Sequence, residues 1–170
     1  MANLIVTVIA IALVAVASLM GAYYGGSAFL KGSAKAAASA LVNQGQQIAA
    51  GWVLFANDNG GTAPTSVEVL VTGNYITENP VAPSSADALN WVLYDLEGPY
   101  AATTNEELGD IPAFAAVTFA KVEICKEVNV AAGVADGVAW STTGSGLFGD
   151  SRFICATGGT NGYVMAYKIQ

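Results

Sequence analysis

The sequence predicts an α+β protein in which a long N-terminal α-helix, hydrophobic and then amphipathic, packs on a small antiparallel β-sheet head. Three observations lead to this prediction. The 170-residue chain begins with an uncharged apolar stretch longer than a globular core helix needs. An amphipathic pattern of helical period follows it. The remainder contains short segments rich in β-forming residues, separated by turn signals.

Charge divides the chain near residue 57. Up to that point Lys31 and Lys35 are the only charged side chains, and all 13 acidic residues come after it. The whole chain is 54% hydrophobic and 11% charged, against about 25% charge in an ordinary soluble domain. We therefore predict a hydrophobic helix over 1–26, an amphipathic helix over 27–57 and a globular head over 58–170.

The hydrophobic helix is long enough to cross a membrane. The 27 residues from Leu4 to Leu30 contain no charge, and as an α-helix they would extend roughly 40 Å, against ~30 Å for a hydrocarbon core. The alternative is a cleaved secretory signal, with a cleavage site at small residues such as Ala15 and Ala17. A secretory signal normally has basic residues before its apolar stretch, and this chain has none there.

Residues 21–26 are expected to be a weak point in this helix. They include three glycines, each of which costs about 1 kcal/mol relative to alanine in a helix. Between them, Tyr23 and Tyr24 suit a membrane interface, and Lys31 and Lys35 follow. By the positive-inside rule, these two lysines would place the head in the cytoplasm.

The amphipathic helix carries an apolar stripe with alternating spacings of three and four residues. Its members are Leu30, Ala34, Ala37, Leu41, Gln44, Ile48, Trp52 and Phe55. The part near Ile48 to Phe55 is expected to pack on the protein's own head. The alanine-rich part from Ala34 to Ile48 predicts a close neighbour, and we expect it to distinguish an assembling subunit from a lone membrane tether.

The head is expected to contain about four antiparallel strands, a short helical turn and one further helix. The predicted elements are a helical turn at 66–70, strands at 89–94 and 115–122, a helix at 123–130, and strands at 152–156 and 163–169. The last two strands would be joined by the glycine-rich turn at 157–162.

Cys125 and Cys155 are expected to form one disulfide, which closes a loop of about 30 residues. A free, buried pair is the alternative. A disulfide requires an oxidising compartment, and this requirement outweighs the topology signal of two lysines. The chain has no histidine and no CxxC motif, which argues against a metal site.

The sequence predicts no enzyme and no cofactor. Without histidine no Ser–His–Asp triad is possible, and Ser145 lacks the GxSxG context. Glu106, Glu107 and Asp110 could pair as carboxylates, but a solvated acidic loop is the simpler interpretation. The segment 57–60 loosely resembles a calcium loop without the required ligand spacing. The net charge of −7 and the absence of a basic cluster argue against nucleic acid as a partner.

These features together resemble a bacterial type IV pilin of the type IVb branch. The resemblance rests on the apolar start at 1–20, the stripe at 30–55, and the Cys125–Cys155 pair. The segment 124–129 resembles the helix that carries the first cysteine in that branch. The chain departs from the family at Ile5, where a glutamate is usual, and it has glycines where a proline is common.

The resemblance implies a structural subunit of an extracellular pilus filament. It implies that Met1 is a processed, methylated N-terminus and that the filament lies on the cell surface. The implied partners are further copies of the chain, the inner membrane before assembly, and a pilus assembly machinery. The residues expected to pack in the filament core are Leu4, Val8, Ile11, Ala15 and Leu19. The alternative function is a membrane-tethered exported binding domain, or a pseudopilin that forms no long filaments.

Overall fold

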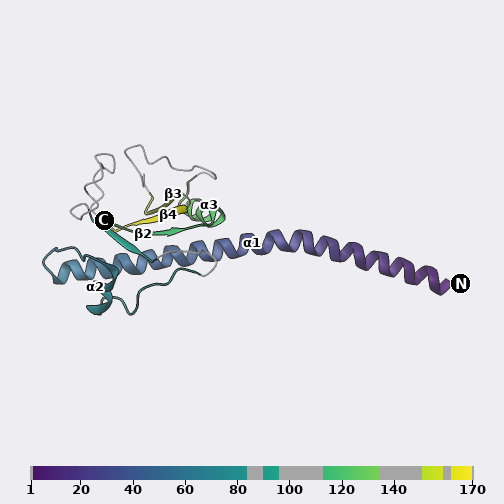
Figure 1. Cartoon of the computed structure of the whole chain (residues 1–170), viewed down its shortest axis with the longest axis horizontal. Helices are drawn as coiled ribbons and strands as arrows, with labels where there is room; N and C mark the ends of the chain where they lie inside the picture. Colours follow the sequence, from purple (N-terminus) through teal and green to yellow (C-terminus); the bar gives the residue numbers. More distant parts are fainter. Residues whose placement is uncertain (1, 84–89, 96–112, 135–150, 159–161, 170) are drawn as a thin grey trace.

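A computed structural model describes residues 2–83, 90–95, 113–134, 151–158 and 162–169. Its elements are α1 (Ala2–Asp58), α2 (Val67–Thr72), β1 (Val92–Asp95), β2 (Ala113–Phe119), α3 (Val122–Ala131), β3 (Phe153–Gly158) and β4 (Gly162–Lys168). Figure 1 shows one long helix that carries a small sheet near its C-terminal end. The predicted α+β layout, with a long N-terminal helix and a four-stranded antiparallel sheet, is confirmed.

Helix α1 is a single element of 57 residues, which corresponds to a length of about 85 Å. It continues through the glycine-rich segment 21–26, where the space around Gly21, Gly25 and Gly26 is open. Gly60 and Gly61 end the helix at positive φ angles of 67° and 90°, a region in which glycine has no steric penalty. The N-terminal half of α1 projects away from the rest of the protein (Figure 1).

The four strands form one antiparallel sheet with the order β1-β2-β4-β3. Strand β4 pairs Met165 with Val117 of β2 on one side and with Cys155 of β3 on the other. The predicted helix at 123–130 is confirmed as α3. The predicted strand at 115–122 is wrong at its C-terminal end, because β2 ends at Phe119 and Val122 already begins α3. The first strand, predicted at 89–94, starts too early, because β1 begins at Val92; Leu89 itself lies outside the described residues.

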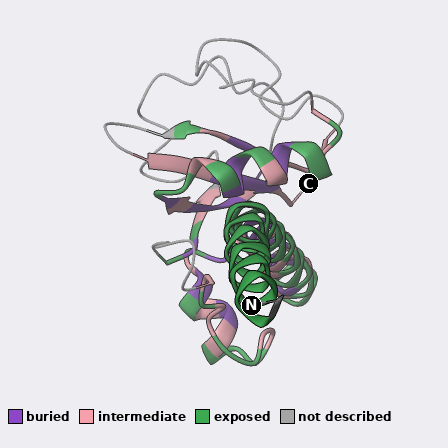
Figure 2. Ribbon diagram, turned by 90° about the vertical axis from the view of Figure 1, so that its right-hand side faces the viewer, coloured by how far each residue is buried: buried purple, intermediate pink, exposed green. Residues whose placement is uncertain are grey.

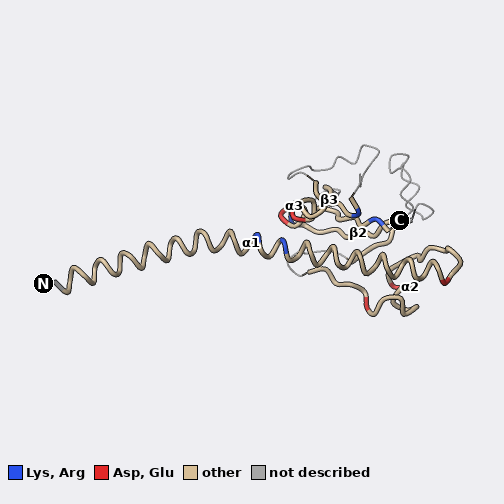
Figure 3. Tube along the Cα trace, turned by 180° about the vertical axis from the view of Figure 1, so that it is seen from behind, with Lys and Arg blue, Asp and Glu red and all other residues tan. Residues whose placement is uncertain are grey.

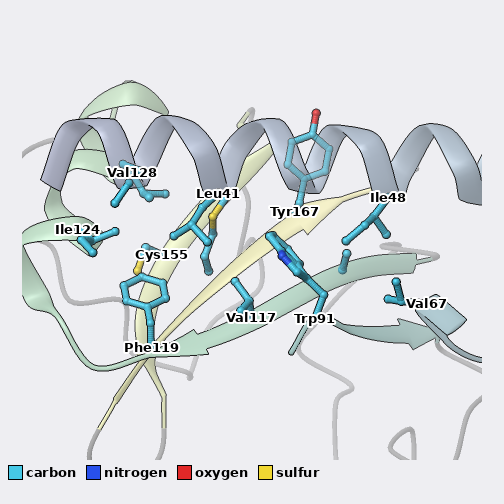
Figure 4. Close-up of a cluster of buried hydrophobic side chains, with 14 of the residues drawn as sticks. Leu41, Ile48, Val67, Trp91, Val117, Phe119, Ile124, Val128, Cys155 and Tyr167 are labelled. Carbon is cyan, nitrogen blue, oxygen red and sulfur yellow. The ribbon is translucent and has the colours of Figure 1, made fainter. Parts of the chain in front are cut away.

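The main core lies between α1 and one face of the sheet. Figure 4 shows side chains of α1, α3 and the strands meeting there, among them Leu41, Ile48, Trp91, Val117, Phe119, Ile124, Val128 and Tyr167. The small helix α2 lies on the other side of α1 (Figures 1 and 2). A second, smaller cluster on the opposite sheet face contains Ala116, Ile154 and Ala166.

Two glycines in the C-terminal half of α1 permit close packing. A Cβ atom at Gly45 would lie 2.8 Å from carbon atoms of the Tyr167 ring, and one at Gly51 would lie 2.6 Å from Cγ2 of Ile76. Both distances are too short for real contacts. The sheet and the segment after α2 therefore approach α1 at positions where the helix has no side chain.

Candidate functional site

The N-terminal half of α1 carries most of the exposed large hydrophobic residues of the described chain. We call residues 3–32 the stem; every one of them is exposed, including Leu4 at 73% and Leu19 at 72%. The most apolar 18-residue window of α1 has a mean hydropathy of 2.7, and none of it is buried. A soluble monomer rarely exposes an apolar patch above a few hundred Å². This surface is therefore the candidate functional site, and by length and composition the helix could cross a membrane.

The five residues predicted to pack in a filament core lie on the stem. Leu4, Val8, Ile11, Ala15 and Leu19 follow spacings of three and four residues, which place them along one face of the helix. All five are exposed, and none belongs to the buried clusters of the described chain. The described part of this chain covers none of these five residues.

Hydroxyl groups along the stem bond to the helix itself. Thr7 Oγ1 donates to the carbonyl of Asn3 at 2.7 Å, and Ser18 Oγ donates to that of Val14 at 2.7 Å. The hydroxyl of Ser27 bonds in the same way at 3.2 Å. A hydroxyl that bonds one turn back along its own helix needs no water. These groups can therefore enter a bilayer or a protein core without a loss of hydrogen bonding.

The stem changes character at its two tyrosines. The 20 residues from Asn3 to Ala22 would extend about 30 Å as a helix, which matches a hydrocarbon core. Tyr23 and Tyr24 follow, exposed and in edge-to-face contact with their ring centroids 5.5 Å apart. Their amphipathic rings suit the interface between lipid and water.

The alanine-rich stripe is covered by the protein's own head, contrary to expectation. Ala34, Ala37 and Leu41 are buried in the main core, because α3 and the sheet pack on α1 from residue 34 onward. Leu30 is not part of this stripe, since it is 66% exposed below the head. The close neighbour that these alanines predicted is α3. The stripe therefore does not distinguish an assembling subunit from a tether.

The predicted disulfide between Cys125 and Cys155 is present and joins α3 to β3. Asn129, one turn after Cys125, is buried and bonds to the main chain of Cys155. Ser151 Oγ donates to the carbonyl of Ala132 at 2.9 Å, where α3 ends. Asn129 was not among the predicted residues, although its spacing of four from Cys125 places both on one helix face.

A polar side chain of α1 makes a further link to the head that the sequence pattern did not reveal. The Trp91 indole Nε1 donates to Gln44 Oε1 at 3.0 Å, and Gln44 Nε2 donates to the carbonyl of Val81. The helical spacing of the sequence places Gln44 in the apolar stripe of α1. Its amide instead satisfies the indole N–H of the buried Trp91 and attaches the segment after α2 to α1.

The remaining candidates do not form a site among the described residues. The segment 57–60 is the end of α1, where Asn59 Nδ2 caps its own helix through the carbonyl of Phe55. No group of three metal-ligating acidic, cysteine or histidine side chains occurs in the described part of the chain. Four other candidates lie outside the described residues, and they are Met1, Ser145, the pair Glu106–Glu107 and Asp110.

Comparison of the chain with known protein families, with curated proteins and with solved structures found no match.

Proposed function

We propose that this protein is the structural subunit of a type IV pilus-like extracellular filament, in which the stems pack together in the core and the heads form the surface. One observation carries this proposal. A fully exposed apolar stem continues without interruption into a helix that is locked into a folded, disulfide-bonded head. A subunit built in this way must keep its stem in a bilayer or against other stems.

Small residues on the stem support close packing between copies. In an apolar environment helices associate through shape and close approach, which small residues permit. The stem has such residues at Ala10, Ala12, Ala15, Ala17 and Gly21. Its hydroxyl groups are satisfied within the helix, so that the same surface suits both lipid and a filament core.

The disulfide supports a head on the exported side of the membrane. Such bonds persist in oxidising compartments and are rare in the cytosol. We therefore infer an inner-membrane pool, from which an assembly machinery extracts the subunit into a filament on the cell surface. The assembly machinery in this proposal is inferred from the resemblance to type IVb pilins. Because position 5 is Ile, the first 30 residues would pack without any charged side chain.

Bulky substitution on the stem tests the proposal. We expect Ala15→Trp/Ala17→Trp to abolish filaments in sheared cell-surface material viewed by electron microscopy, because two indoles prevent close stem packing. Ala15→Gly/Ala17→Gly is the matched control, since it keeps the side chains small. In both variants the Cys125–Cys155 disulfide should form, which shows that the head is folded. Normal filaments from the tryptophan variant would contradict the proposal.

A membrane-tethered exported binding domain, or a pseudopilin without long filaments, is the second candidate. It is favoured by one observation: the head itself covers the alanine-rich stripe, so this part of α1 is not available for packing between copies. The wild-type protein separates the two candidates. An absence of fibres from cells that export the folded, membrane-bound protein would favour the tether.

A further inference from the structure

Positive charge is concentrated at the base of the head, where the stem ends. Lys31 and Lys35 are exposed and one helical turn apart. Neither forms an ion pair with a described residue. The next charged residue along α1 is Asp58, at the far end of the helix, about 35 Å away at 1.5 Å per residue. Figure 3 shows the two lysines and the end of α1 at opposite ends of the helix segment that carries the head.

Negative charge in the described part of the chain lies mainly at two places. Asp58, Glu68 and Glu78 are exposed at the distal end of the head, at and near the end of α1 and α2, whereas Glu123 and Glu127 lie on α3, which packs on α1 at the base of the head (Figure 3). No lysine or arginine occurs between Lys35 and Lys121 in the sequence. The last turn of α1 contains no basic residue either. A helix C-terminus carries about half a negative charge and normally favours a cation, so Asp58 adds a carboxylate where a positive charge is favoured.

We propose that Lys31 and Lys35 of one subunit bind the distal carboxylates, Asp58, Glu68 and Glu78, of a second copy. This inference rests on the filament function proposed above and names the contact that sets the axial register. The base of one head would meet the distal end of the next. Such a head-to-tail contact uses two different surfaces of the same chain, and repetition of it propagates a filament.

A second copy is favoured over other occupants by the distribution of charge. The two lysines are the only charged side chains in the first 57 residues, and Ile5 offers none. They are therefore the only side-chain charges that this part of α1 can present to a neighbour's acidic head. Charge pairs of this kind contribute specificity and register more than affinity. In a filament whose stems carry no other charged side chain, register is the property that packing alone leaves poorly determined.

Charge reversal on each surface, followed by mixing, tests the contact. Lys31→Glu/Lys35→Glu makes both surfaces of the contact negative. Glu68→Lys/Glu78→Lys places new cations on the distal end, opposite the lysines of the neighbouring copy. We expect each variant alone to lower the sedimented filament fraction about tenfold, as lost pairs become repulsive ones. Co-expression of the two variants should restore filaments, because the reversed base of one complements the reversed distal end of the other.

The matched control is Arg152→Glu/Lys168→Glu, which changes the net charge as much as Lys31→Glu/Lys35→Glu does, at an exposed position before β3 and a half-buried position at the end of β4. It should form filaments at the wild-type level. Disulfide formation and recovery in the membrane fraction verify that every variant folds and inserts.

Three results would overturn the inference. The first is normal filament formation by Lys31→Glu/Lys35→Glu alone. The second is failure of the mixture to restore filaments. The third is a loss of membrane recovery in Lys31→Glu/Lys35→Glu, which would assign the lysines to anionic lipid headgroups. An absence of filaments from the wild-type protein would instead contradict the proposed function, so the two failures are distinguishable.

Discussion

The side-chain amide of Asn129 is paired on both sides with the main chain of Cys155. Asn129 Nδ2 donates to the Cys155 carbonyl at 2.9 Å, and Asn129 Oδ1 accepts from the Cys155 N–H at 2.8 Å. Cys155 lies on β3, an edge strand of the sheet, and its sulfur is bonded to Cys125. Helix α3 is thus attached to this edge by the disulfide and by the Asn129 amide, which takes up the N–H and carbonyl of Cys155. An occupied edge strand cannot pair with another chain at that point.

Replacement of Asn129 is expected to destabilise the protein strongly. Asn129→Leu would leave the buried N–H and carbonyl of Cys155 without partners, at a cost of about 2–4 kcal/mol. The measurement is chemical denaturation of the full chain in detergent. Asn43→Leu, at an exposed position of α1, is the control and should change stability by no more than ~0.5 kcal/mol. Equal effects of the two substitutions would show that the amide pairing contributes nothing.

The disulfide is expected to contribute about 3 kcal/mol, because it closes a loop of 30 residues in the unfolded chain. Cys125→Ser/Cys155→Ser should lower the denaturation midpoint accordingly. Treatment with a reductant should lower the midpoint of the wild type to that of the variant and leave the variant unchanged. A wild-type midpoint insensitive to complete reduction would refute this expectation.

Gly45 is expected to be required for the contact between α1 and β4. In Gly45→Ala the new Cβ atom would meet the Tyr167 ring at 2.8 Å, and overpacking of this kind typically costs about 1–3 kcal/mol. Gly32→Ala is the control, because nothing lies within 4 Å of the added atom there. That substitution should be neutral or stabilising by up to ~1 kcal/mol, from helix propensity. A stabilising Gly45→Ala would show that Tyr167 moves aside freely.

Tyr75 is expected to make stability fall at alkaline pH. Burial raises the pKa of Tyr75 above its ordinary value of 10.0, and the neighbouring Asp58 carboxylate raises this pKa further. The folded state therefore holds the phenol proton more tightly than the unfolded state. This contribution to stability is complete below pH 10.0 and is lost as the pH rises through the pKa of the folded state.

Denaturation at a series of alkaline pH values checks this expectation. Tyr75→Phe should flatten the decline of stability above pH 10.0 relative to the wild type. Tyr23→Phe, on the exposed stem, should leave the decline unchanged. Parallel pH profiles for the wild type and Tyr75→Phe would contradict the assignment.

Local pattern predicted most of the described elements of this protein, with errors of a few residues at their ends. An uncharged run and a stripe of helical period predict α1, since both properties depend on neighbours along one helix. The helix that became α3 and the strands at 113–119, 153–158 and 162–168 were predicted to within a few residues. Two cysteines left one possible intramolecular pair, so the sequence predicted the partners of the disulfide, and the structure shows the bond in place of the alternative, a free, buried pair.

The strand order and the use of each helix face depend on contacts between distant residues. The same alanine stripe suits a neighbouring subunit or the protein's own α3, and only the position of the head shows that α3 covers it. Gly45 and Tyr167 meet across most of the chain, and Asn129 and Cys155 are 26 residues apart. Periodicity reports which side of a helix is apolar. It cannot report what covers that side, because burial is a property of the folded chain. In the structure the head covers the stripe and leaves the stem exposed.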